Sequence, residues 1–133
     1  MSSKFSFEYA PDVQVLVERL IRVLELDYIK KENVICMRSY GSTANAYARI
    51  WELPSIWQKA LNIEPHYVIE VLSQHYDKLP QEEKEKTLIH ELLHIPKSFS
   101  GATVPHKNFD RRIDARTVNR LYKRYKERLM DYG

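Results

Sequence analysis

The spacing of apolar residues predicts a helix over residues 11–26 near the start of the chain. One face of this helix is polar and consists of Gln14, Glu18, Arg22 and Glu25. The opposite face is apolar and consists of Val13, Leu16, Val17, Leu20 and Leu24. This repeat is typical of an amphipathic helix that packs one face on a core. Pro11 suits the first turn of such a helix.

The middle of the chain changes to the pattern expected for strands. Segments 33–39, 46–53 and 66–72 are rich in β-branched and aromatic residues and are separated by turn or breaker residues. Residues 55–61 suggest one short helical turn between the second and third strand. We therefore expect a small three-stranded sheet.

Two further helices are expected after the strands. One begins near Pro80, carries acidic residues in its first turn and continues to Ile95, where Pro96 ends it. Residues 97–105 form a loop, and a last helix is expected from about Asn108 to Leu129. The order of helix, three strands, helix, loop and helix predicts an α+β fold, and the 133 residues predict a single domain over 1–133.

The predicted helix that ends at Ile95 contains His90-Glu91-Leu92-Leu93-His94, an H-E-x-x-H motif. Residues four apart lie on one face of a helix, so His90 and His94 can direct two imidazoles at one metal ion. Glu91 would then stand beside the metal as a general base that takes a proton from water. The same five residues also occur by chance on structural helices, in which case Glu91 is an ordinary solvated side chain.

Zinc in hydrolases takes three protein ligands, so a third must come from elsewhere in the chain. The candidates are His66, His75, His106, Glu70, Asp110 and Asp114. His106 is the preferred one, because the loop after Pro96 can fold back over the helix. Asp110 is the runner-up ligand, or accepts the spare N–H of a liganding histidine. His66 and His75 are expected to be surface or strand-end residues.

The motif and its surroundings resemble known metallopeptidases. His90–His94 followed by His106-Lys107-Asn108-Phe109 resembles the SprT-like metallopeptidases, and the flanking sequence over about residues 10–130 is closer to small metallopeptidases of archaea and phages. The resemblance implies a minimal zincin-like domain with Zn2+ on His90, His94 and His106, and Glu91 as the base. Unlike the SprT family, the chain has no Cys-rich zinc ribbon, since its one cysteine is Cys36.

The function expected from these residues is zinc-dependent hydrolysis of peptide bonds. A second donor to the oxyanion is expected from one of Tyr40, Tyr47, His66, Arg111 or Tyr122, among which the sequence does not choose. The substrate is expected to add as a strand at a sheet edge, and the strand 66–72 is a candidate to lie near the cleft.

Charge leaves two alternatives open. The net charge is +3, but residues from Lys107 onward hold nine Lys or Arg against four acids, or +5, which leaves −2 on the first 106 residues. The basic helix 107–128 can be a solvated face, or can dock on nucleic acid as part of a nucleic-acid-associated protease. The other alternative is a non-catalytic, zinc-stabilised binding domain. With no signal segment, no membrane-length apolar run and a lone cysteine, a cytoplasmic location is expected.

Overall fold

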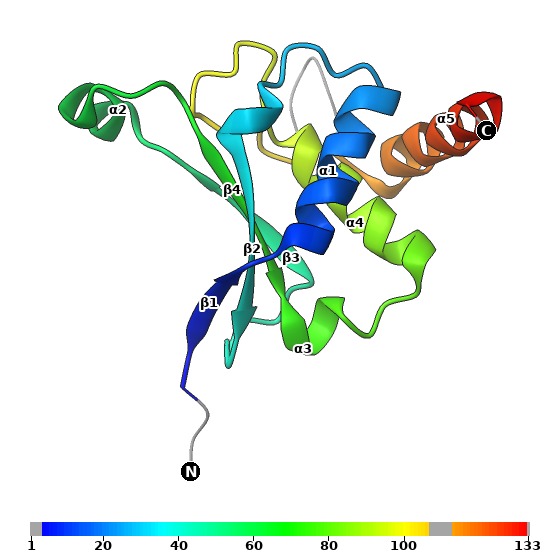
Figure 1. Ribbon diagram of the computed structural model, residues 1–133, viewed down its shortest axis with the longest axis horizontal. Coiled ribbons are helices and arrows are strands. Elements are labelled where there is room, and N and C mark those ends of the chain that lie inside the picture. Colours follow the sequence, from blue (N-terminus) through cyan, green and yellow to red (C-terminus); the bar gives the residue numbers. More distant parts are fainter. Residues whose placement is uncertain (1–3, 107–112, 133) are drawn as a thin grey trace.

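The computed structural model describes residues 4–106 and 113–132, and Figure 1 shows its arrangement. In chain order the elements are β1 (Ser6–Tyr9), α1 (Pro11–Val23), a 3-10 turn (Lys31–Asn33), β2 (Val34–Tyr40), β3 (Ala48–Glu52), α2 (Ser55–Leu61), β4 (Tyr67–Leu72), α3 (Ser73–Tyr76), α4 (Gln81–Leu93) and α5 (Ala115–Tyr132). The α+β class predicted from the sequence is confirmed.

The described strands form one mixed sheet in the order β1-β2-β4-β3. β1 and β2 are antiparallel, β2 and β4 are parallel, and β3 pairs antiparallel with β4. The expected three-stranded sheet is wrong, because β1 adds a fourth strand at one edge. That strand has only four residues, all exposed, so it carries no buried-face signal in the sequence.

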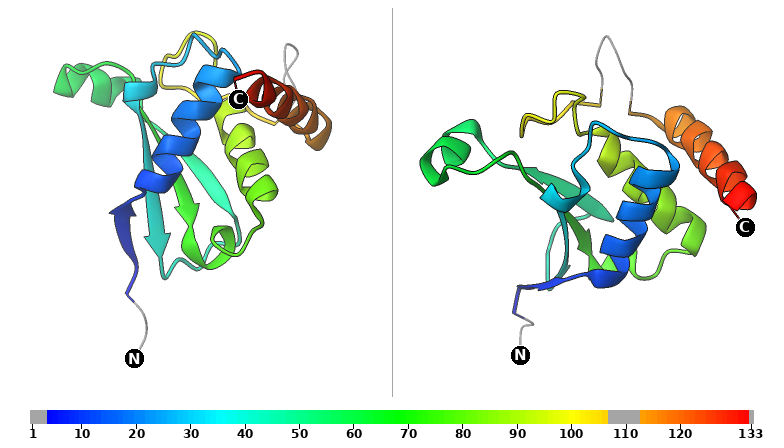
Figure 2. Two further views of the ribbon diagram at one scale, coloured as in Figure 1. Left: turned by 45° about the vertical axis from the view of Figure 1, so that its right-hand side comes forward. Right: turned by 45° about the horizontal axis from the view of Figure 1, so that its top comes forward.

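β4 lies at the centre of the sheet although it is the last strand in the chain. Its residues Tyr67, Ile69 and Val71 point to the helical side and are buried with α1 and α4 in one core. Figures 1 and 2 show α1 and α4 on the same side of the sheet. The core therefore fixes the helix that carries the H-E-x-x-H motif against the central strand.

The helices follow their predictions with shifted ends. α1 ends at Val23, three residues before the predicted end, and the residue at position 25 takes a positive φ of 54°. α4 ends at Leu93 with His94 as its C-cap, since Pro96 cannot continue the helix. The predicted start of the last helix at Asn108 lies outside the described residues, and α5 begins at Ala115. Across the described residues, no helix has the length and apolar character needed to span a bilayer.

Candidate metal centre

The last turn of α4 directs the two histidines of the motif to the same side. His94 is the C-cap but keeps helical dihedral angles, φ −74° and ψ −14°, so the four-residue spacing still stacks it beside His90. The two ring centroids are 5.2 Å apart. The local helix geometry alone therefore brings two potential ligands together.

The loop after α4 brings the third histidine back to this pair. The backbone N–H of Val104 donates to the carbonyl oxygen of His94 at 2.7 Å, and Nδ1 of His94 lies 2.6 Å from the Val104 carbonyl oxygen. Two residues later, Nε2 of His106 lies 3.2 Å from Nε2 of His90. Ligand atoms of His90, His94 and His106 all lie within 4.8 Å of one another.

A buried tyrosine of β4, Tyr67, makes two hydrogen bonds to the backbone of the loop between α4 and His106. The hydroxyl of Tyr67 donates to the carbonyl oxygen of Ala102 at 2.7 Å and accepts from the N–H of Gly101 at 2.8 Å. Gly101 has a φ of +96°, a conformation that a side chain rarely adopts. The return of the chain toward His106 thus depends on Tyr67 and Gly101, a role that nothing in their local sequence indicates.

The three imidazoles present the donor chemistry that a metal ion requires. The carbonyl of Val104 can only accept, so Nδ1 of His94 carries the proton and Nε2 keeps its lone pair. Burial and the two neighbouring imidazoles lower the pKa of His90 to about 4, so its ring is neutral at pH 7. Three imidazoles whose ring nitrogens converge in this way can supply the donors of a single metal ion.

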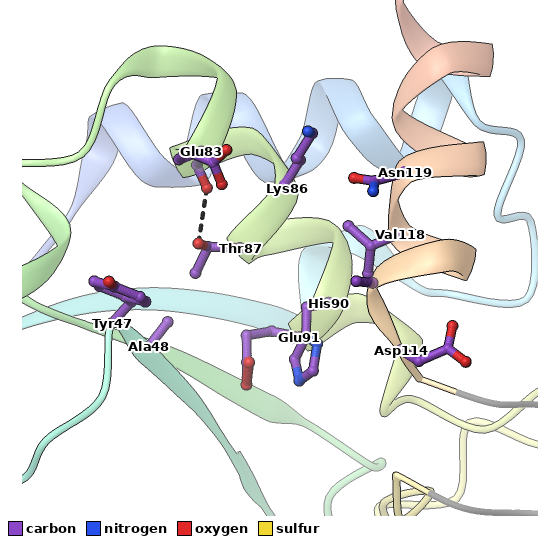
Figure 3. Close-up of a pocket in the computed structure, with 11 residues that line it drawn as sticks. Tyr47, Ala48, Glu83, Lys86, Thr87, His90, Glu91, Asp114, Val118 and Asn119 are labelled. Atoms are coloured by element: carbon purple, nitrogen blue, oxygen red, sulfur yellow. Dashed lines mark hydrogen bonds between the residues drawn. The ribbon is translucent and has the colours of Figure 1, made fainter.

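Glu91 lies next to this cluster and is itself buried, with 6% of its surface exposed. Its side chain and that of His90 both extend from α4 into the same cleft (Figure 3). Burial raises the pKa of Glu91 to about 8, whereas a cation on the neighbouring histidines would act in the opposite direction. A buried carboxylate beside a cation site can accept a proton from one reacting group and donate it to another.

The cleft in front of Glu91 has a volume of about 550 Å³. α4 forms one wall through Thr87 and His90, and α5 lies across from it (Figure 3). Ala48, the first residue of β3, and Tyr47, which directly precedes the strand, also line the cleft. From α5 and the turn before it, the lining residues are Asp114, Ala115, Val118 and Asn119. The cleft therefore runs between the edge strand β3 and helix α5.

Among the other ligand candidates that the structure describes, Asp114 lines the cleft, whereas His66, His75 and Glu70 do not. Nδ1 of His66 lies 2.7 Å from the backbone carbonyl of Glu64, two residues away in the chain. The ring of His75 packs edge-on against Tyr47. Asp110, like the oxyanion candidate Arg111, lies outside the described residues.

Glu70 is fully buried within the sheet rather than placed at the histidine cluster. Burial acts to raise its pKa, but hydrogen bonds from Arg49 at 2.9 Å and from Trp51 at 2.7 Å outweigh this and lower it. The charge of Glu70 is thereby neutralised by Arg49 on the neighbouring strand. We therefore interpret Glu70 as a residue that stabilises the sheet and not as a metal ligand.

The oxyanion candidates are also separated by the fold. Tyr47 lines the cleft together with Glu91. Tyr40 ends β2, His66 precedes β4, and Tyr122 donates its hydroxyl to Glu85 at 3.3 Å. Tyr47 is therefore the described candidate that shares a cavity with the predicted base.

Comparison with known families agrees with this geometry. The model of the family described as "Putative phage metallopeptidase" matches residues 5–126. The chain belongs to this family. The match spans β1 through most of α5 and includes all three clustered histidines and Glu91, and the family description implies a metal ion. No curated protein and no solved structure matches the chain, and the relation to SprT-like enzymes stays a prediction.

Proposed function

We propose that this protein is a zinc-dependent metallopeptidase in which His90, His94 and His106 hold the metal and Glu91 is the general base. The observation that carries the proposal is the convergence of three imidazoles within 4.8 Å, beside a buried carboxylate on the same helix. The family membership supports the class of reaction. Three histidine nitrogens are one of the ligand sets found in catalytic zinc sites, which keep one position for water or substrate.

Zinc in such a site acts as a Lewis acid that polarises a carbonyl and makes water more acidic. Glu91 takes the proton from the water that attacks the peptide carbonyl, and then delivers it to the leaving amine. The buried position of Glu91 keeps bulk water from competing for that proton. The hydrogen bond from His94 to Val104 keeps the ring of His94 in one orientation and one tautomer.

The substrate binds, in this proposal, as an extended strand along β3. β4 is flanked on both sides, by β2 and β3, and so cannot accept an added strand. β3 is an edge strand, and its first residue Ala48 lines the cleft beside Tyr47. Main-chain pairing with β3 would position a peptide with little regard to sequence, and the hydroxyl of Tyr47 is the proposed second donor to the oxyanion.

The experiment that tests this function compares single variants for metal content and for cleavage of a peptide library. Glu91→Gln keeps the shape of the side chain, so it should retain one zinc per chain and lose turnover. His94→Ala should lose the metal, while His66→Ala, which removes a histidine outside the cluster, should change neither quantity. Peptide hydrolysis by Glu91→Gln at the wild-type rate would refute the assignment of the base.

Metal content and turnover also distinguish the proposed enzyme from a non-catalytic, zinc-stabilised binding domain. A zinc-stabilised binding domain would bind one zinc, show no turnover in the wild-type protein and unfold when the metal is removed. The enzyme proposed here should lose activity on chelation but keep its fold, because its core of α1, β4 and α4 is apolar and independent of the histidines.

A nucleic-acid-associated protease is the second candidate, favoured by the charges on α5. Between Ala115 and Lys126 this helix contains no acid, and its exposed basic residues are Arg116, Arg120, Lys123, Arg124 and Lys126. Binding through these cations should weaken steeply with salt, with a log–log slope of about −0.7 to −0.9 per phosphate contact. Arg120→Ala should reduce that slope by about one contact, and binding that is insensitive to salt would remove this candidate.

A further inference from the structure

The outer face of the sheet carries apolar side chains that no described helix covers. The strand register places Tyr9, Met37 and Glu70 in one row across β1, β2 and β4, and Ile35, Val68 and Trp51 in the next. Figures 1 and 2 show α1 and α4 on the opposite side of the sheet. A shallow groove of about 480 Å³ runs over this outer face between Phe7, Tyr9 and Trp51. A sheet in a stable domain normally covers its apolar face with a second layer.

Helix α2 extends this exposed apolar surface. The helix has no buried residue and leans away from α1, α4 and α5 in all views (Figures 1 and 2). It attaches to the body through Gln58, whose amide donates to the carbonyl oxygens of Leu53 and Ser100 at 2.8 and 3.0 Å. Ile56 lies on nearly the opposite side of the helix from Gln58, and 74% of its surface is exposed. Ile56 therefore points away from the attachment of α2.

The exposed area is large enough for a stable protein interface. We define the outer apolar surface as Phe5, Phe7, Tyr9, Trp51, Ile56, Trp57, Leu61 and Ile63, whose exposed fractions run from 43% to 78%. A fully exposed side chain of this size presents about 200 Å², so eight half-exposed side chains leave about 800 Å². That is about the area that each partner buries in a standard interface.

The charge on this surface indicates what kind of partner fits it. None of its eight residues is charged, and Glu70, which lines the groove between them, is fully buried and paired with Arg49 at 2.9 Å. A highly charged ligand such as nucleic acid would find few unpaired cations here, in contrast to α5. A surface built mainly of aromatic and aliphatic side chains has the composition of a homodimer interface, and two-fold dimers are the commonest closed assembly.

We propose that two copies of this chain associate through the outer apolar surface to form a two-fold dimer. The cleft beside Glu91 lies between α4 and α5 on the other side of the sheet, so both clefts stay open in the dimer. The proposal is independent of the peptidase assignment, because it uses none of the histidine cluster.

The test measures the mass of the full chain in solution by light scattering and sedimentation over a dilution series. Wild type should reach twice the 15.9 kDa of one chain. Ile56→Glu and Tyr9→Glu should each raise the dimer dissociation constant by about tenfold or more. An acidic residue in the first turn of α2 is favourable for the helix, so Ile56→Glu should not unfold it.

The matched control is Met130→Glu, which places the same charge on a residue of α5 that is 82% exposed; this variant should dimerise as wild type does. The chain has two tryptophans, and both belong to the outer apolar surface. Their emission should therefore shift to shorter wavelength as wild type associates, and should not shift with concentration in Ile56→Glu. A wild type that stays monomeric throughout, or a dimer that survives both surface variants, would overturn the proposal.

Discussion

Tyr67→Phe is the substitution that most sharply tests how the fold builds the metal centre. It removes one hydroxyl from the central strand and leaves the ring in place. That hydroxyl makes two hydrogen bonds to the loop, with Gly101 and Ala102, four to five residues before His106. The change therefore acts on the position of the third histidine without touching any of the three imidazoles.

The size of the effect follows from those two bonds. Leaving a buried donor or acceptor without its partner costs about 1–3 kcal/mol. If the cost falls on the loop conformation that presents His106, metal affinity drops by about tenfold for each 1.4 kcal/mol. We therefore expect Tyr67→Phe to bind zinc roughly tenfold more weakly than wild type, and to unfold at a lower temperature.

The assay is competition for zinc against a chromophoric chelator, followed by thermal unfolding of the metal-free proteins. Tyr76→Phe is the matched control, because Tyr76 is also buried but its hydroxyl has no hydrogen-bond partner among the described residues. Tyr76→Phe should keep the zinc affinity of wild type. If Tyr67→Phe also kept it, the idea that Tyr67 positions the loop would be refuted.

Three further predictions concern the loop, the metal and an ion pair. Gly101→Ala should destabilise the protein by about 1–3 kcal/mol in urea unfolding, because φ is +96° and a Cβ would meet the Leu53 carbonyl oxygen at 2.7 Å; unchanged stability would contradict the close approach. Chelation should leave the far-ultraviolet circular dichroism unchanged while abolishing turnover, whereas a collapse of helical signal would show that the metal maintains the fold. Arg38 holds the pKa of Asp12 below its usual range, so the pair stabilises the fold at neutral pH and this contribution is lost as pH falls below about 4. Between neutral and acid pH, the free energy of unfolding should therefore fall less in Asp12→Asn than in wild type. The difference between the two losses should be under about 1 kcal/mol, because Asp12 is exposed. Equal losses in the two proteins would refute the role of this pair.

The sequence predicted the elements whose signals are local and repeated. α1 and α4 have apolar spacing and end signals that are read within one helix, and the four-residue spacing of His90 and His94 needs only the helix itself. The grouping of His106 with them was predicted from the loop that reverses the chain after Pro96. That grouping is confirmed in the structure, while the roles of the residues remain proposals.

Features that depend on contacts between distant segments were not readable. β1 is a strand because it pairs with β2, whose paired residues are 28 to 34 positions further along the chain, and its own four residues are exposed. The insertion of β4 between β2 and β3 decides which strand is the edge, and the sequence left this open. From the sequence alone Glu70 is a plausible ligand, because its cross-strand partner Arg49 lies 21 residues away in the chain.

The central claim, one metal ion on three histidines, is tested most directly by a crystal structure of the zinc-loaded protein with anomalous scattering measured at the zinc edge. The account predicts one strong anomalous peak per chain, within about 2.0–2.1 Å of a ring nitrogen of each of His90, His94 and His106. For His94 the bonded atom should be Nε2, because Nδ1 is hydrogen-bonded to Val104. A peak at any other set of side chains, or no peak at this cluster in a protein that contains stoichiometric zinc, would contradict it.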